Sequence, residues 1–201
     1  MVDWIDQPLA NISAALKDGK LSAIDLNEQA IDRHNIWDDQ FKAYKTWDSK
    51  IIRELAKTAD NAFKTGKYLG QLQGIPISVK DLQHVEGVLC TEGSPIYADR
   101  VSPESDMLVQ SLENNGAIVV GKSNTPEFGA GANTFNEVFG ATLNPWDTRM
   151  TCGGSSGGAA VSLATGQTWL ATGSDLGGSL RIPGAFCSVV GFRPSPGRCP
   201  R

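Results

Sequence analysis

Half of the glycines in this chain fall in its last quarter, and this distribution constrains the fold more than any other feature of the sequence. Residues 151–201 hold 11 of the 22 glycines and a single acidic residue, Asp175. Glycine permits backbone conformations closed to other residues and lets main-chain N–H groups approach a ligand closely. Apolar runs such as 159–164 alternate with these glycines, which indicates a folded site rather than a linker. The segment contains two serine clusters, 153–158 and 175–179.

The composition is that of a globular protein. With 201 residues, 40% of them hydrophobic and 20% charged, the chain is expected to form one domain, two at most. A net charge of −4 without a dense Lys/Arg cluster argues against nucleic acid as a partner. No apolar run approaches the ~20 residues of a membrane helix. The first twenty residues lack the layout of a signal peptide, so we expect a cytoplasmic protein that does not contact a membrane.

The cysteines argue against a metal site. Cys90, Cys152, Cys187 and Cys199 form no Cys-x-x-Cys pair, and the chain has two histidines to join them. A structural zinc site needs tighter clustering of nitrogen and sulfur ligands than this. We therefore expect no metal, and reduced, buried thiols at all four positions.

Residues 1–68 are predicted to form a helical N-terminal segment. Ser22 can cap a helix whose apolar positions include Leu26 and Ile31. A second amphipathic helix is predicted over 49–65, ending near a glycine, and a weak alternation over 41–45 suggests a short strand between the two.

From residue 69 onward, short apolar runs are each broken by glycine or proline. Three of these runs are predicted as buried strands and two intervening segments as helices: strands at 75–79, 117–120 and 169–172, and helices at 104–115 and 157–165. Alternating strands and helices predict an α/β fold, a sheet sandwiched between helices on both faces. We expect residues 1–68 and this core, 69–201, to form one domain overall.

Residues 116–123 match the spacing of a phosphate-binding loop, Gly, four residues, then Gly-Lys-Ser. That motif works because the intervening residues form a loop whose N–H groups surround phosphate, with a helix after the lysine. Here the four residues are Ala-Ile-Val-Val, which favour a strand, and Pro126 prevents an uninterrupted helix. Nucleotide binding is therefore not expected, and Lys122 is predicted to end a strand.

A catalytic serine in this chain would need a base other than histidine. His34 falls on a predicted helix, and His84 lies four residues beyond Lys80 without a Gly-x-Ser-x-Gly turn. Lys80 closes the apolar run 74–79, where burial disfavours the ammonium form and leaves a neutral amine able to act as a base. The alternative for a lysine at a strand end is a salt bridge, here to the neighbouring Asp81.

These features together resemble the amidase signature family. Residues 74–198, about 125 of the 201, carry the resemblance, and the helical N-terminus follows it more loosely. The matching segments occur in the family's order, which makes the resemblance specific: Gly74–Asp81, Gly121–Phe128, Asn144–Asp147, Cys152–Gly158, Gly173–Pro183 and Phe186–Gly197.

The resemblance implies a Ser-cisSer-Lys triad that hydrolyses carboxylic amides to an acid and ammonia or an amine. Ser179 would be the nucleophile, Ser155, preceded by a cis peptide bond, the proton relay, and Lys80 the neutral base. The resemblance further implies two sets of supporting groups. The oxyanion hole would be formed by backbone N–H groups of Leu176, Gly177, Gly178 and Ser179. The residues that hold the surrounding loops would be Ser156, Asp175 and Arg181.

The resemblance also implies a mixed-sheet α/β/α sandwich that this chain builds only in part, as an N-terminal half-length member. Family enzymes are more than twice as long, and the later half completes the sheet and much of the pocket. We expect a small-molecule amide as substrate, no cofactor, and a missing C-terminal half or a second copy as partner. Two alternatives remain open: a non-catalytic fragment, and a fragment of an amidotransferase A-type subunit.

Overall fold

The computed structural model describes residues 3–199, which form helices on both sides of a small mixed sheet. Two short 3₁₀ turns, at Pro95–Tyr97 and Glu127–Gly129, lie in the loops. The helices are α1 (Leu9–Lys17), α2 (Ala23–Phe41), α3 (Ser49–Lys64), α4 (Met107–Asn114), α5 (Gly157–Ala164) and α6 (Arg181–Phe186). The strands are β1 (Tyr44–Trp47), β2 (Pro76–Lys80), β3 (Ile118–Ser123), β4 (Phe135–Asn136), β5 (Gly140–Ala141) and β6 (Leu170–Ala171).

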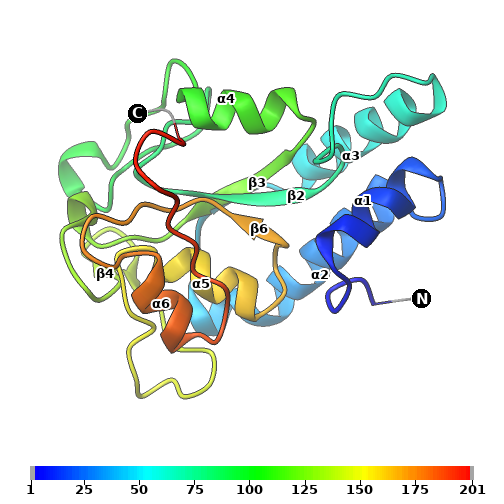
Figure 1. Ribbon diagram of the computed structural model, residues 1–201. Helices are drawn as coiled ribbons and strands as arrows, with labels where there is room; N and C mark the ends of the chain where they lie inside the picture. The colour runs from blue at the N-terminus through cyan, green and yellow to red at the C-terminus, as the bar shows by residue number, and fades with distance from the viewer. Residues whose placement is uncertain (1–2, 200–201) are drawn as a thin grey trace.

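Four of the strands form one sheet in the order β1-β3-β2-β6. β2 runs parallel to both β3 and β6, whereas β1 is antiparallel to β3. Figure 1 shows α4 on one side of this sheet, with α5 and α6 on the other. The fold class predicted from the sequence, an α/β sandwich with a mixed sheet, is confirmed.

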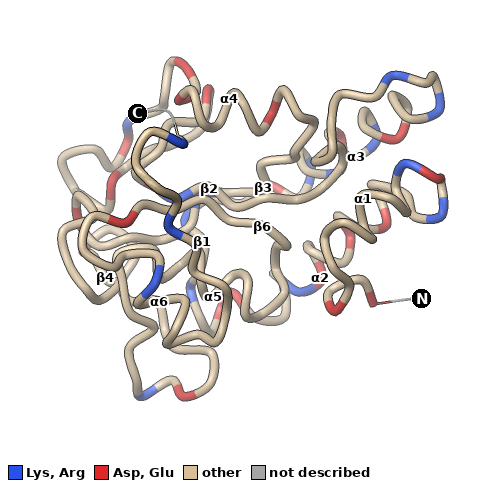
Figure 2. Tube along the Cα trace, viewed as in Figure 1, with Lys and Arg blue, Asp and Glu red and all other residues tan. Residues whose placement is uncertain are grey.

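The two predicted N-terminal helices are also confirmed, and their caps explain where they begin. The Ser22 side chain accepts a hydrogen bond from the Asp25 N–H at 3.0 Å, and Asp48 accepts from the N–H groups of Lys50 and Ile51 at 2.9 and 3.1 Å. Such side chains satisfy N–H groups that have no partner inside the helix. Charged residues are frequent on α2 and α3 and absent from α5 and β6 (Figure 2).

Some elements differ from the sequence prediction. The strand expected over 41–45 lies at Tyr44–Trp47, and because it pairs with β3 the N-terminal segment contributes directly to the sheet of the core. Helix α1 was not predicted, since no side chain caps it, and α6 was not predicted because its six residues include Pro183 and Gly184. The two-residue strands β4 and β5 are too short to show a periodic pattern.

The core lies between the sheet and its covering helices. Val79 of β2 packs with Val109 of α4, while Ile77 belongs to the larger cluster that includes Leu26 of α2 and Val161 of α5. Helix α5 begins so close to the end of β3 that a Cβ at Gly158 would lie 2.4 Å from the Asn124 nitrogen. Only glycine fits there, so the glycine-rich segment is packed into the core and positions α5 under the sheet.

The cysteines are free thiols, and three of them follow the prediction of burial: Cys90, Cys152 and Cys187. The prediction is wrong for Cys199, which is exposed because it follows a surface turn in which the Arg198 N–H donates to the Ser195 carbonyl. Within residues 3–199, no helix has both the length and the apolar character needed to cross a membrane.

Candidate active site

Lys80 is the last residue of β2 and is completely buried. Its backbone N–H donates to Thr172 Oγ1 at 3.0 Å, a residue that directly follows β6. Because β2, β3 and β6 are parallel, their carboxyl ends meet at one edge of the sheet, which is where open α/β sheets commonly place functional groups.

Three hydroxyl groups surround the Lys80 side chain. Its Nζ donates to Ser155 Oγ at 2.6 Å and to Ser156 Oγ and Ser174 Oγ, each at 3.0 Å. Burial lowers the pKa of Lys80 to about 7, with the negative charge of Asp175 acting in the opposite direction. The amine is therefore largely neutral slightly above neutral pH, and a neutral amine can accept a proton.

The hydrogen of the Ser156 hydroxyl is used in a hydrogen bond to another group. It donates to the Ser174 carbonyl at 3.3 Å, so toward Lys80 it acts as an acceptor. The Ser155 hydroxyl, which is 2% exposed and has the shortest distance to Nζ, keeps its hydrogen available for the amine. Of these two neighbouring serines, Ser155 is thus the one suited to donate to Lys80.

The loop that carries Ser155 is held by a close approach to Thr134. The peptide bond between Gly154 and Ser155 is cis. Thr134 Oγ1 donates to the Gly153 carbonyl at 2.9 Å and accepts from the Gly157 N–H at 3.1 Å. A Cβ at Gly157 would lie 2.2 Å from the same oxygen, so the loop requires glycine there.

The second serine cluster lies against the first. The Ser156 N–H donates to the Ser179 carbonyl at 3.1 Å, which joins the two loops through their backbones. The Asp175 carboxylate, 1% exposed, organises the second loop by accepting hydrogen bonds from the N–H groups of Gly178 and Leu180 at 2.7 and 3.1 Å. Arg181 donates to both oxygens of Asp175 at 2.9 Å and holds the pKa of that carboxyl well below its usual range.

The four N–H groups expected to form an oxyanion hole are not equivalent. The N–H of Gly178 is bound to Asp175 and is therefore not available to a ligand in this arrangement. Across residues 3–199, the N–H groups of Leu176, Gly177 and Ser179 form no hydrogen bond, whereas the N–H groups of Gly178 and Leu180 both donate to Asp175. These three N–H groups lie on one glycine-containing loop.

Asp81 does not pair with Lys80, so the salt bridge considered for that lysine is wrong. Asp81 Oδ1 accepts instead from Lys122 Nζ at 3.0 Å, and both side chains are buried. Lys122 lies on β3, as predicted, and residues 118–123 form a strand rather than a phosphate-binding loop.

Neither histidine is hydrogen-bonded to Lys80 or to the serines of the two loops at 153–158 and 174–179. His34 Nδ1 lies 3.1 Å from Gln167 Oε1, and its ring stacks on Trp47; His84 Nδ1 lies 2.9 Å from Ser102 Oγ. Among residues 3–199, no group of three or more His, Cys, Asp and Glu side chains is arranged to hold a metal ion.

Sequence reasoning missed two polar residues of the site, Ser174 and Thr172. Both residues follow β6. Ser174 Oγ accepts a hydrogen bond from the Lys80 side chain, and Thr172 Oγ1 accepts one from the Lys80 backbone N–H. Polar residues directly after a predicted parallel strand were the available signal, because they lie beside the residue that ends the neighbouring strand.

The fold and site define an α/β protein with a buried lysine and paired serine loops at the carboxyl edge of its sheet. A sequence model of the amidase family matches residues 25–201, and the chain belongs to that family.

The relatives extend well beyond the part that this chain matches. The A-type subunit of the glutamyl-tRNA(Gln) amidotransferase of Natranaerobius thermophilus is 40% identical over 193 residues, 96% of this chain and 39% of that protein. Its counterpart in Dehalococcoides mccartyi is 38% identical over 201 residues, 100% of this chain and 41% of that protein. A bacterial aryl acylamidase of the amidase signature family superposes with a TM-score of 0.90 at 31% identity, covering 96% of this chain and 40% of that structure. The chain therefore spans about two fifths of their length.

Proposed function

We propose that this chain carries the reactive groups of an amide-cleaving enzyme, with Ser179 as nucleophile, Ser155 as proton relay and Lys80 as base. The observation that supports this most directly is the 2.6 Å contact between Lys80 Nζ and Ser155 Oγ in a fully buried setting. An isolated lysine would be protonated at neutral pH, and burial removes that preference.

The proton moves along the relay in one direction and then back. Lys80 accepts the proton of Ser155 as Ser155 accepts that of Ser179, and Ser179 Oγ attacks the amide carbonyl carbon. The negative oxygen that forms is bound by the N–H groups of Leu176, Gly177 and Ser179. Removing one such donor typically slows a reaction by about 100–1000-fold.

The tetrahedral intermediate then breaks at its carbon–nitrogen bond. The relay returns the proton to the leaving nitrogen, which departs as ammonia or an amine and leaves an ester on Ser179. Water adds to that ester by the same proton transfers and releases a carboxylic acid. One amide and one water give one acid and one amine, without a cofactor.

Asp175, Arg181 and Ser156 support the reacting groups in this proposal. Asp175 fixes the loop of the nucleophile through the Gly178 and Leu180 N–H groups, and Arg181 keeps Asp175 ionised. Ser156 ties Lys80 to the Ser174 carbonyl and the Ser179 carbonyl. Gly178 contributes the turn, with φ of 119°, rather than an oxyanion donor.

Labelling with a fluorophosphonate tests the nucleophile. The probe is applied to the 201-residue chain and to a completed protein, in which the chain is fused to the part of the Natranaerobius thermophilus relative that it does not match. We expect the completed protein to be labelled at Ser179 and Ser179→Ala to remain unlabelled, while Ser111→Ala, at an exposed helical serine, is labelled normally. Labelling of another serine, or none in a folded completed protein, would overturn the assignment. If the completed protein reacts and the chain alone does not, the chain needs the remaining part for activity.

Release of ammonia from glutamine is a second candidate function. It is favoured by the names of curated relatives, which are amidotransferase subunits with 38–40% identity over nearly the whole chain. The chemistry at Ser179 would be the same, with the side-chain amide of glutamine as substrate. Ammonia release by the completed protein from glutamine, compared with simple aliphatic and aryl amides, separates the two functions.

A further inference from the structure

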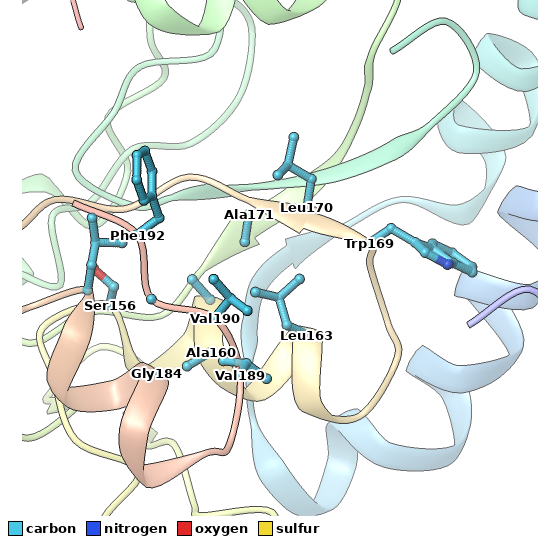
Figure 3. A pocket seen from close by; sticks show the side chains of 13 residues that line it. Ser156, Ala160, Leu163, Trp169, Leu170, Ala171, Gly184, Val189, Val190 and Phe192 are labelled. Carbon is cyan, nitrogen blue, oxygen red and sulfur yellow. The ribbon is translucent and has the colours of Figure 1, made fainter. Parts of the chain in front are cut away.

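The segment after α6 returns to the candidate active site. A Cβ at Gly191 would lie 2.5 Å from the carbonyl oxygen of Leu180, the residue directly after the second serine cluster. Only glycine allows so close an approach. Phe192, the next residue, lines the same pocket as Ser156 of the first cluster (Figure 3). The segment therefore brings the residue that follows, Arg193, to the side of the site.

Two arginines lie beside the Asp175 carboxylate and differ in how they contact it. Arg181 donates a hydrogen bond to each of its oxygens, both at 2.9 Å. Arg193 Nε lies 4.0 Å from Asp175 Oδ1, which is an ion pair without a hydrogen bond. The Arg193 side chain is 43% exposed, whereas that of Asp175 is 1% exposed. With two guanidinium groups and one carboxylate, this cluster carries a net positive charge.

The charge of Asp175 acts on Lys80. Asp175 directly follows Ser174, whose hydroxyl accepts a hydrogen bond from Lys80 Nζ at 3.0 Å. Its negative charge stabilises the ammonium form of Lys80 and so opposes the effect of burial on the pKa of Lys80. A carboxylate without cations beside it would therefore keep more of this amine protonated.

The other charged groups near Lys80 are already matched or lie outside its contacts. Of the elements that pack against β2, α5 and β6 carry no charged residue, and α2 and α4 contribute apolar side chains to its clusters. β3 contributes Lys122, whose charge is balanced by Asp81 at 3.0 Å. His84 is bound to a serine outside the two clusters. In the part of the chain that the structure describes, this leaves Asp175 and its two arginines.

We propose that Arg193 is a positioning residue of the candidate active site, a second cation at Asp175 that offsets the negative charge of this carboxylate at Lys80. The inference rests on the proposed function, in which Lys80 is the base. Arg181 fixes the loop through hydrogen bonds, whereas Arg193 makes no hydrogen bond to Asp175 and adds its charge alone. The field of a cation opposes that of a carboxylate at a nearby group, so Arg193 favours the neutral amine.

A titration of Lys80 by nuclear magnetic resonance tests this role without relying on catalysis. The 201-residue chain is labelled with ¹³C-lysine, and the Cε signal of Lys80, identified by its absence in Lys80→Met, is followed from pH 5 to pH 10. The parent midpoint should lie at about 7. Arg193→Met should move it to higher pH by roughly 0.3–0.6, the size expected for losing a half-exposed charge at intermediate distance.

Two further variants separate charge at this position from other effects. Arg193→Lys keeps the cation and should restore the parent midpoint. Arg149→Met is the matched control, because Arg149 also pairs with an aspartate, Asp147, but at the surface and outside the site, so its midpoint should equal that of the parent. In the completed protein, the rising limb of amide hydrolysis should move with the midpoint of Lys80 in each variant.

The outcomes distinguish the role of Arg193 from that of Lys80. If Lys80 titrates near pH 7 in the parent and Arg193→Met leaves the midpoint unchanged, the role of Arg193 is overturned and the proposed base is retained. A Lys80 signal that shows the charged form up to pH 9 in the parent overturns both. An equal displacement in Arg149→Met would assign the effect to net charge and overturn the inference. Thermal unfolding checks each variant, and Arg193→Gln replaces Arg193→Met if the latter is not folded.

Discussion

Lys122 Nζ donates to Asp81 Oδ1 across 3.0 Å, with the two side chains 0% and 1% exposed. The other Asp81 oxygen accepts from the Thr91 hydroxyl at 2.6 Å. Side chains alternate along a strand, so Asp81 lies on the opposite face from Lys80, and the register of β2 and β3 sets Lys122 beside Val79. The pairing leaves Lys80 among hydroxyls, with no carboxylate in hydrogen-bond contact.

Lys122→Met should destabilise the protein by about 3–5 kcal/mol, since it leaves the Asp81 carboxylate buried without its cation. The double variant Lys122→Met/Asp81→Asn should regain much of that loss, because the side chain at position 81 is then uncharged and can still bind Thr91. Urea unfolding at pH 7 measures both changes. A single variant within 1 kcal/mol of the parent would show that the ion pair contributes little.

Lys80→Met should change how stability depends on pH. The pKa of Lys80 is about 7 in the folded chain, against an ordinary value of 10.5. Between these values the unfolded lysine holds a proton that the folded one lacks, so stability rises with pH by up to ~1.4 kcal/mol per unit. Lys80→Met removes this contribution, and the difference between the two urea-unfolding profiles isolates it. If the two profiles run parallel from pH 7 to pH 10, the lysine is charged in the folded state.

The same amine should control activity. In the completed protein, the rate of amide hydrolysis should rise with pH, reach half of its maximum near pH 7 and level off above that, as the neutral form of Lys80 becomes dominant. Lys80→Met should abolish this activity, whereas His84→Ala should retain the parent rate and pH profile, because His84 binds Ser102 and not the serine loops. A dead His84→Ala enzyme that is still folded would point to a histidine mechanism.

Asp175→Asn should slow fluorophosphonate labelling of Ser179 by about 10–100-fold, because small displacements of reacting groups carry costs of that size. One end of the asparagine amide is a donor and cannot accept from the Leu180 N–H or from Arg181. Asp147→Asn is the matched control, since Asp147 also binds an arginine, Arg149, at the surface. Equal labelling rates for the two variants would remove Asp175 from the positioning of the loop.

The sequence was informative where local chemistry decides the structure. Ser22 and Asp48 cap the two predicted helices, and the apolar run before Lys80 forms a buried strand that ends at this lysine. Burial of Lys80 followed from the same run, and the glycine-rich last quarter of the chain identified the two serine clusters.

Contacts between residues that are distant in the sequence could not be predicted from local chemistry. The register between β2 and β3 determines which lysine forms the ion pair with Asp81. That lysine is Lys122, although Lys80 is the neighbour of Asp81 in the sequence. The hydrogen bond from the Gly178 N–H to Asp175 forms only once the loop has folded, so the sequence does not show that this N–H is already bound. Ser174 was overlooked since its contact with Lys80 requires β6 beside β2.

The hydroxyls around Lys80 should be distinguishable by substitution. Ser155→Ala should abolish hydrolysis in the completed protein, because it interrupts the path between Ser179 and the amine. Ser174→Ala should keep hydrolysis and move the rising limb of the pH profile to lower pH, since a hydroxyl that accepts from Nζ stabilises the ammonium form and its loss lowers the pKa of Lys80. Ser111→Ala, at an exposed serine of α4, serves as the unchanged reference. Initial rates measured from pH 5 to pH 9 report both effects, and a Ser155→Ala enzyme that matches Ser174→Ala in rate would mean that the proton does not pass through Ser155.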